Sequence, residues 1–209
     1  MKNKKLFALF LCAALVFSLL ASGCSPEKNS QESPPAEQDS SEPPAETGDS
    51  AGTAAALGSL KTFAAGTLDG GTFTQEDIAA KDVTVINFWS TTCGPCIAEM
   101  PDLAEFSNAL PDNVQVVTVC LDGAWDPESA EAVLNEAGFE GVTLITGEGD
   151  LLDVCNNIRY TPTTVFVDSE GSLVGDAIIS RQEDLSGTFL AAVNTVLKES
   201  GKAEISLEA

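Results

Sequence analysis

Two cysteines three positions apart, where an apolar run meets a helical pattern, constrain this chain more than any other feature. Residues 83–89 form a β-branched and aromatic run typical of a buried strand, and a short polar turn joins this run to Cys93 and Cys96. Cysteines at this spacing can form a disulfide across the first turn of a helix. The unpaired N–H groups and partial positive charge of a helix N-terminus stabilise a thiolate, the form of cysteine that attacks disulfides. The segment therefore predicts a redox-active cysteine pair on a strand–turn–helix.

Residues 1–23 have the organisation of a cleaved secretory signal. Three lysines precede the apolar run Leu6–Leu20, and small residues then lead to Cys24. The run is too short for a membrane-spanning helix with these flanks. Small residues ending in Gly-Cys resemble the lipobox of bacterial lipoproteins, in which the cysteine becomes acylated, although Ala21 stands where leucine is usual. The alternative is ordinary cleavage nearby, which would release a soluble secreted protein.

Residues 24–56 are expected to form a disordered acidic tether. The segment holds five of the ten prolines of the chain, and Ser, Gln and Glu make up most of the rest. It has no aromatic and almost no aliphatic residue before Leu57, so apolar burial cannot offset the entropy lost on folding. We expect a spacer that holds the domain away from a membrane surface. A specific binding function for the spacer is the alternative.

Residues 57–209 are long enough for one domain with its own hydrophobic core. Removing residues 1–23 takes three lysines and no acid, which changes the formal net charge from −22 to −25. This charge repels nucleic acid and anionic lipid, so we expect no nucleic-acid partner and membrane attachment through a lipid anchor on Cys24. The chain has no histidine, which excludes Ser-His and Cys-His catalytic pairs and histidine metal sites. We expect no metal and no cofactor beyond the redox-active disulfide.

The apolar pattern predicts strands that alternate with helices and a late hairpin. In chain order we expect a hairpin over 61–73, a helix start capped by Thr74, a strand over 83–88, a helix over 93–110, a strand over 114–121, a helix over 127–137, a strand over 142–146, a helix over 150–158, a hairpin of strands 163–168 and 173–179, and a helix over 184–199. Pro101 is expected to kink its helix. This order predicts an α/β fold with a central mixed sheet flanked by helices.

The residues around the cysteine pair carry a family resemblance. Trp89 and the motif Cys93-Gly94-Pro95-Cys96, with Thr161-Pro162 farther along the chain, resemble the thioredoxin superfamily. Glu99 and Pro101 match the membrane-tethered, extracytoplasmic TlpA/ResA branch, which typically has these residues at these offsets. The resemblance covers about residues 60–200. It implies a thioredoxin-like fold with an N-terminal hairpin and with a strand and helix inserted before the proline loop, within residues 127–146.

The resemblance also implies roles for individual residues. Cys93 would be the exposed nucleophile and Cys96 the resolving cysteine. Pro162 would follow a cis peptide bond, although sequence statistics alone favour trans, and the backbone of Thr161 would bind the partner chain. Glu99 would tune the cysteines and move the proton of the buried thiol. Without the resemblance, Glu99 is interpreted as an ordinary surface glutamate on a helix.

Three positions depart from cytosolic thioredoxins or from the TlpA/ResA branch. Asn87 replaces the buried aspartate of thioredoxins, which leaves Glu99 as the nearby candidate for proton transfer. Thr92 stands where thioredoxins usually have tryptophan, so the partner groove is expected to differ. The dipeptide Gly94-Pro95 matches cytosolic thioredoxins rather than the TlpA/ResA branch, and it favours a reducing centre.

The other two cysteines of the domain have two interpretations. Cys120 ends a predicted buried strand, and Cys155 lies on the predicted helix before Thr161-Pro162. A pair of cysteines in an exported chain tends to oxidise, which predicts a second disulfide. Alternatively, both are small buried hydrophobic residues. The Cα separation that decides between these interpretations is not encoded in the spacing.

These features together favour an extracytoplasmic thiol–disulfide oxidoreductase that reduces disulfides of exported proteins. The expected partners are disulfide-containing exported proteins and, from the family comparison, a transmembrane thiol carrier that donates electrons. We expect the protein to be anchored to the cell membrane as a lipoprotein.

Two alternative functions remain open. A thiol peroxidase shares this fold, but the residues before Cys93 lack the expected proline, and only Arg159 and Arg181 are available as the expected arginine. A Cu(I)-binding module would use the two thiolates of Cys93 and Cys96 as ligands. It would have to bind the ion without histidine.

Overall fold

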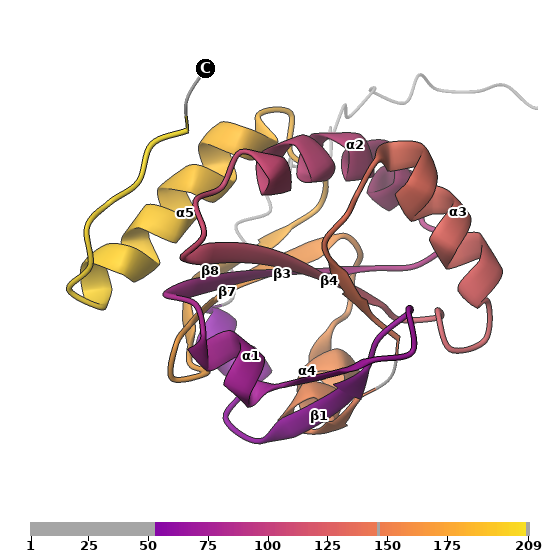
Figure 1. Cartoon of the computed structure of the whole chain (residues 1–209), viewed down its shortest axis with the longest axis horizontal. Coiled ribbons are helices and arrows are strands. Elements are labelled where there is room, and N and C mark those ends of the chain that lie inside the picture. Colours follow the sequence, from indigo (N-terminus) through magenta and orange to yellow (C-terminus); the bar gives the residue numbers. More distant parts are fainter. Residues whose placement is uncertain (1–52, 146, 208–209) are drawn as a thin grey trace, which may run out of the picture. The chain divides into compact units, whose positions relative to one another are not determined.

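The computed structural model describes residues 53–145 and 147–207 of the 209-residue chain. A five-stranded mixed sheet forms the centre of this part (Figure 1). β3 (Val83–Trp89) pairs in parallel with β4 (Val114–Cys120) and antiparallel with β7 (Thr163–Asp168), and all seven residues of β3 are buried. Burial on both faces explains why this strand is almost entirely apolar in sequence. The spatial order of the strands is β5 (Val142–Leu144), β4 (Val114–Cys120), β3 (Val83–Trp89), β7 (Thr163–Asp168) and β8 (Leu173–Ile179).

Helices cover both faces of this sheet (Figure 1). Each face has its own hydrophobic cluster, and neighbouring residues of β3 point to opposite faces, so Phe88 and Trp89 belong to different clusters. One face carries α2 (Gly94–Asn108), α3 (Pro127–Ala137) and α5 (Leu185–Glu199), and the other carries α1 (Gln75–Ala79) and α4 (Asp150–Asn157).

A second sheet of three strands contains the predicted N-terminal hairpin. Its order is β2 (Thr72–Thr74), β1 (Phe63–Gly66) and β6 (Glu148–Gly149). Thr74 caps α1, because its side chain accepts a hydrogen bond from the N–H of Glu76 while Asp77 accepts one from the N–H of Thr74 at 2.7 Å. This reciprocal cap explains why so short a helix begins there.

The predicted fold class is confirmed, and most predicted elements lie close to their observed positions. α2 continues through Pro101, and Gly138 ends α3 in the left-handed conformation with φ of 70°. The strand and helix implied within residues 127–146 are α3 and β5. β5 ends at Leu144, two strand residues of β6 were not predicted, and Thr146 lies outside the described residues.

The predicted domain start at Leu57 is too late. A 3₁₀ helix, η1 (Ala54–Leu57), precedes it, Ala54 is fully buried, and Thr53 forms a β-bridge with Asp176 of β8. Alanine contributes little to a hydrophobic pattern, so no apolar pattern marks this segment. The predicted signal, Cys24 and most of the predicted tether lie outside the described residues. Within residues 53–145 and 147–207, no helix has the length and hydropathy needed to cross a membrane.

Candidate active site at the start of helix α2

Cys93 and Cys96 form a disulfide at the N-terminus of α2, with a Cα–Cα distance of 5.3 Å. Cys93 is the N-cap residue, and Pro95 lies in the first turn, where its missing N–H costs no helical hydrogen bond. The backbone N–H of Cys96 is directed at Cys93 Sγ, 3.2 Å away. Cys93 is half-buried and Cys96 is buried, so Cys93 is the more accessible sulfur.

Asp122, which follows β4, holds the loop between β3 and α2. Thr91 donates to the Asp122 carboxylate from its backbone N–H at 2.9 Å and from its hydroxyl at 2.8 Å. Partial burial opposes ionisation of Asp122, but the hydrogen bonds from Thr91 outweigh it and hold the pKa of Asp122 below its usual value. Asp122 is not among the site residues predicted from the sequence. The available signal was the expected parallel pairing of β3 and β4, which brings their carboxyl ends together.

The loop before β7 lies beside the cysteines. The Thr161–Pro162 peptide bond is cis, as the family resemblance implied. Cys93 Sγ lies 3.5 Å from the carbonyl oxygen of Thr161. Two hydrogen bonds fix the loop, one from Ser180 N to Pro162 O at 2.9 Å and one from Thr163 Oγ1 to Tyr160 O at 2.7 Å. The fold therefore brings together two segments that the sequence places far apart.

Glu99 lies one turn of α2 after Cys96 and is only 2% exposed. Its Oε1 accepts a hydrogen bond from Asn87 Nδ2 at 3.1 Å, and its Oε2 accepts one from the backbone N–H of Gln182 at 3.2 Å. Asn87 also donates to Thr164 Oγ1 at 2.9 Å. Burial raises the pKa of Glu99, and the hydrogen bonds from Gln182 and Asn87 offset this only in part. The interpretation of Glu99 as a surface glutamate is therefore wrong.

The remaining predicted residues of the active-site loop are Trp89, Gly94 and Pro95, and they lie in different environments. Trp89 is the last residue of β3 and is fully buried, so it supports the loop from the core. Its Nε1 has no hydrogen-bond partner within the part of the chain that the structure describes. Gly94 and Pro95 are exposed next to Cys93.

Cys120 and Cys155 do not form a second disulfide, so that prediction is corrected. Both are free thiols, and they pack into hydrophobic clusters on opposite faces of the central sheet. The sheet between them prevents the short Cα separation that a disulfide needs. Burial raises the pKa of Cys120 to about 12 and that of Cys155 to about 11, so both are overwhelmingly protonated at neutral pH.

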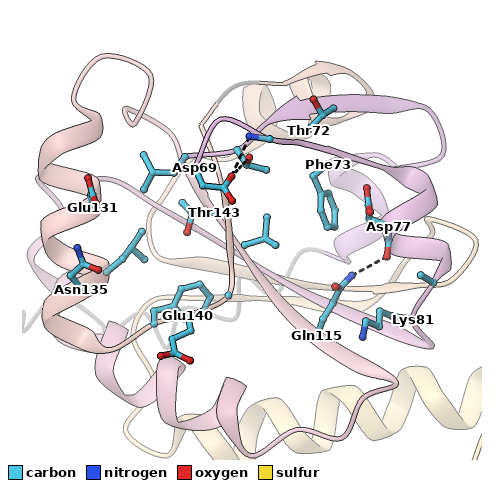
Figure 2. A pocket seen from close by; sticks show the side chains of 18 residues that line it. Asp69, Thr72, Phe73, Asp77, Lys81, Gln115, Glu131, Asn135, Glu140 and Thr143 are labelled. Atoms are coloured by element: carbon cyan, nitrogen blue, oxygen red, sulfur yellow. Dashed lines mark hydrogen bonds between the residues drawn. The ribbon is translucent and has the colours of Figure 1, made fainter.

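A cavity of about 660 Å³ lies apart from the cysteines (Figure 2). It is lined by the hairpin turn around Asp69, by the end of α1, and by residues of α3 and the segment that follows it. Gln115 in its lining is the second residue of β4, whereas the cysteines follow the opposite end of the parallel strand β3. Among the described residues, no group of three or more Cys, Asp or Glu side chains is arranged to hold a metal ion.

Comparisons with known proteins agree with this geometry. A family model described as Redoxin matches residues 47–186. The thiol-disulfide oxidoreductase ResA of Oceanobacillus iheyensis is 39% identical over 107 residues, which cover 51% of this chain and 54% of ResA. YkuV of Bacillus subtilis, also named a thiol-disulfide oxidoreductase, is 27% identical over 106 residues, which cover 49% of this chain and 71% of YkuV. Across five such relatives, the match spans between 54% and 71% of the relative's length.

Solved structures show the same similarity. The thioredoxin domain of a thiol-disulfide oxidoreductase from Bacteroides vulgatus is 26% identical, with a TM-score of 0.53 over 66% of this chain and 97% of that domain. A thiol:disulfide interchange protein from Bacteroides sp. is also 26% identical, with a TM-score of 0.53 over 65% of this chain and 89% of that protein.

Proposed function

This chain belongs to the Redoxin family and resembles its ResA-like thiol–disulfide oxidoreductases, and on this premise we propose that it reduces disulfides of exported proteins through Cys93 and Cys96. One observation carries the proposal. The disulfide caps a helix N-terminus, with the more accessible sulfur beside the cis-proline loop and the other sulfur buried. This arrangement gives one cysteine access to a partner and keeps the second within reach of the first.

The proposed reaction has two exchange steps. The Cys93 thiolate attacks one sulfur of the partner disulfide, which forms a Cys93–partner disulfide and releases the other partner sulfur as a thiolate that takes up a proton. Cys96 then loses its proton and attacks Cys93 Sγ, which releases the second partner thiolate. The partner gains two electrons, and the Cys93–Cys96 disulfide of the structure is the product.

The N-terminus of α2 supports the first step. The N–H of Cys96 directed at Cys93 Sγ, together with the positive end of the helix dipole, favours the thiolate over the thiol. Thr161 would bind the partner backbone, because its carbonyl lies next to the reacting sulfur.

Glu99 is proposed to accept the Cys96 proton in the second step. It is buried one helical turn from Cys96, and its pKa is raised toward the range in which a carboxylate can act as a base near neutral pH. Asn87 would orient the carboxylate through its hydrogen bond to Oε1.

We further propose that the protein works outside the cytoplasmic membrane. Residues 1–23 would be removed as a signal, Cys24 would carry the lipid anchor, and residues 24–56 would form the tether. Reducing equivalents would come from a transmembrane thiol carrier. A Cys24→Ser variant should then shift from the membrane fraction to the soluble extracytoplasmic fraction.

The reaction is tested with the full chain and insulin as the disulfide substrate, in the presence of dithiothreitol. We expect Cys93→Ser to lose catalysis. When reduced Cys96→Ser is mixed with insulin without dithiothreitol, it should accumulate a covalent adduct through Cys93. Cys155→Ser, which alters a free thiol on α4, should keep full activity. Catalysis of insulin reduction by Cys93→Ser at the wild-type rate, above the rate with dithiothreitol alone, would refute the mechanism.

A further inference from the structure

Large hydrophobic side chains are exposed at five positions among the described residues, and three of these lie on segments that carry the cysteine pair or are hydrogen-bonded to its loop. Ile97 follows Cys96 on α2, and Tyr160 directly precedes Thr161, whose carbonyl contacts Cys93 Sγ. The third is Trp125, which is 85% exposed and therefore the least buried of the five. An indole this exposed, on a turn that is hydrogen-bonded to the loop before Cys93, suggests a contact with another molecule.

Hydrogen bonds fix Trp125 close to the active-site loop. The backbone N–H groups of Trp125 and Asp126 both donate to the carbonyl oxygen of Asp122, at 2.9 Å and 3.1 Å. The carboxylate of the same Asp122 binds Thr91, just before Cys93. Asp122 therefore holds both the turn that carries Trp125 and the loop that precedes Cys93.

The surroundings of Trp125 are acidic. Its exposed neighbours in the chain include Asp126 and Glu128, and the chain as a whole has a formal net charge of −22. An indole face is the most favourable aromatic surface for a cation, and nearby carboxylates add to the attraction. A basic side chain is thus electrostatically complementary to this surface, whereas an acidic one is repelled.

We propose that Trp125 selects partner polypeptides that carry a lysine or arginine next to the target disulfide, by binding the basic side chain on its indole face. This inference rests on the proposed reduction of partner disulfides by Cys93. Trp125 contacts the partner polypeptide while it is bound and takes no part in the exchange of disulfide bonds. It therefore acts on the association of the partner and leaves the potential of the Cys93–Cys96 pair unchanged.

The test compares three short disulfide-cyclised peptides that differ at one position beside a cysteine, which is Lys, Leu or Glu. Second-order rate constants for their reduction by the fully reduced full chain are measured at low salt by acid quenching and chromatography. We expect the Lys peptide to react fastest and the Glu peptide slowest. Trp125→Ala should slow the Lys peptide about fivefold, the loss of one exposed cation–π contact, and change the Leu peptide little.

Leu152→Ala is the matched control, because it removes an exposed hydrophobic side chain from α4. It should leave all three rate constants unchanged. Equal slowing of the Lys and Leu peptides by Trp125→Ala would overturn the proposal in favour of an apolar contact, and unchanged rates would overturn it altogether. If the wild-type chain reduces none of the peptides, the proposed function fails together with this inference.

Discussion

Glu99 shows how a single buried residue can link the chemistry of the site to pH. Both of its carboxylate oxygens accept hydrogen bonds, from Asn87 and from the backbone of Gln182, and among the described residues no other acidic residue is buried. Burial nevertheless dominates and raises its pKa. The folded protein therefore holds the Glu99 proton more tightly than the unfolded chain does.

The raised pKa of Glu99 should make the stability of the folded protein fall as the pH rises. The wild type should lose stability relative to Glu99→Gln as the pH rises from the ordinary glutamate pKa of 4.5 through the raised folded-state value. Denaturant unfolding of the oxidised protein between about pH 4 and pH 8 measures this difference. Glu105→Gln, on the exposed side of the same helix, is the control for the loss of one glutamate from α2. A pH-independent difference for Glu99→Gln would contradict the account.

At the scale of elements, both edges of the central sheet are closed by other segments. Leu60 donates its N–H to the carbonyl of Gly171 in the β7–β8 turn at 2.7 Å, and Ser59 bridges Ser172. At the opposite edge, the N–H of Leu68 donates to the carbonyl of Thr143 in β5 at 2.8 Å. These contacts pair edge strands that would otherwise be open to another chain.

The β7–β8 turn should depend on Gly171 for two reasons. Its φ is 78°, and a Cβ at this position would collide with the carbonyl oxygen of Leu60. Gly171→Ala should therefore lower the free energy of unfolding by about 2–4 kcal/mol.

Gly138→Ala isolates the backbone cost, because Gly138 has a similar φ of 70° and open space around the added Cβ. It should cost only about 1 kcal/mol, as measured by denaturant unfolding. Equal losses for the two variants would show that the contact with Leu60 does not constrain the turn.

At the scale of the whole molecule, the sequence predicted the parts of the site that are local. Cys93 and Cys96 were identified from a strand–turn–helix pattern, and the cis bond before Pro162 from the family resemblance. Other features depend on which strands are neighbours. The hydrogen bonds from Thr91 to Asp122 require the carboxyl ends of β3 and β4 to lie side by side. The burial of Glu99 requires the loop that contains Gln182 to cover it. No local pattern carries that information.

The position of η1 is a second feature of this kind. Ala54 is fully buried, whereas the adjacent Ala55 is exposed, so η1 belongs to the domain although its composition resembles the segment before it. In the full chain, Ala54→Asp should lower the free energy of unfolding by at least about 2 kcal/mol, because it buries an unpaired charge. Ala55→Asp should have little effect. Similar unfolding midpoints for both variants would place η1 outside the cooperative unit.

The central claim is that Cys93 and Cys96 form a reducing centre, and the reduction potential of this pair tests it most directly. The full chain is equilibrated in dithiothreitol and glutathione buffers, and the redox state of the peptide with both cysteines is read by mass spectrometry. The account predicts a potential near that of thioredoxin, about −270 mV. A value near that of a strong oxidant, about −120 mV, would make the protein a disulfide donor and contradict the proposed direction of electron flow.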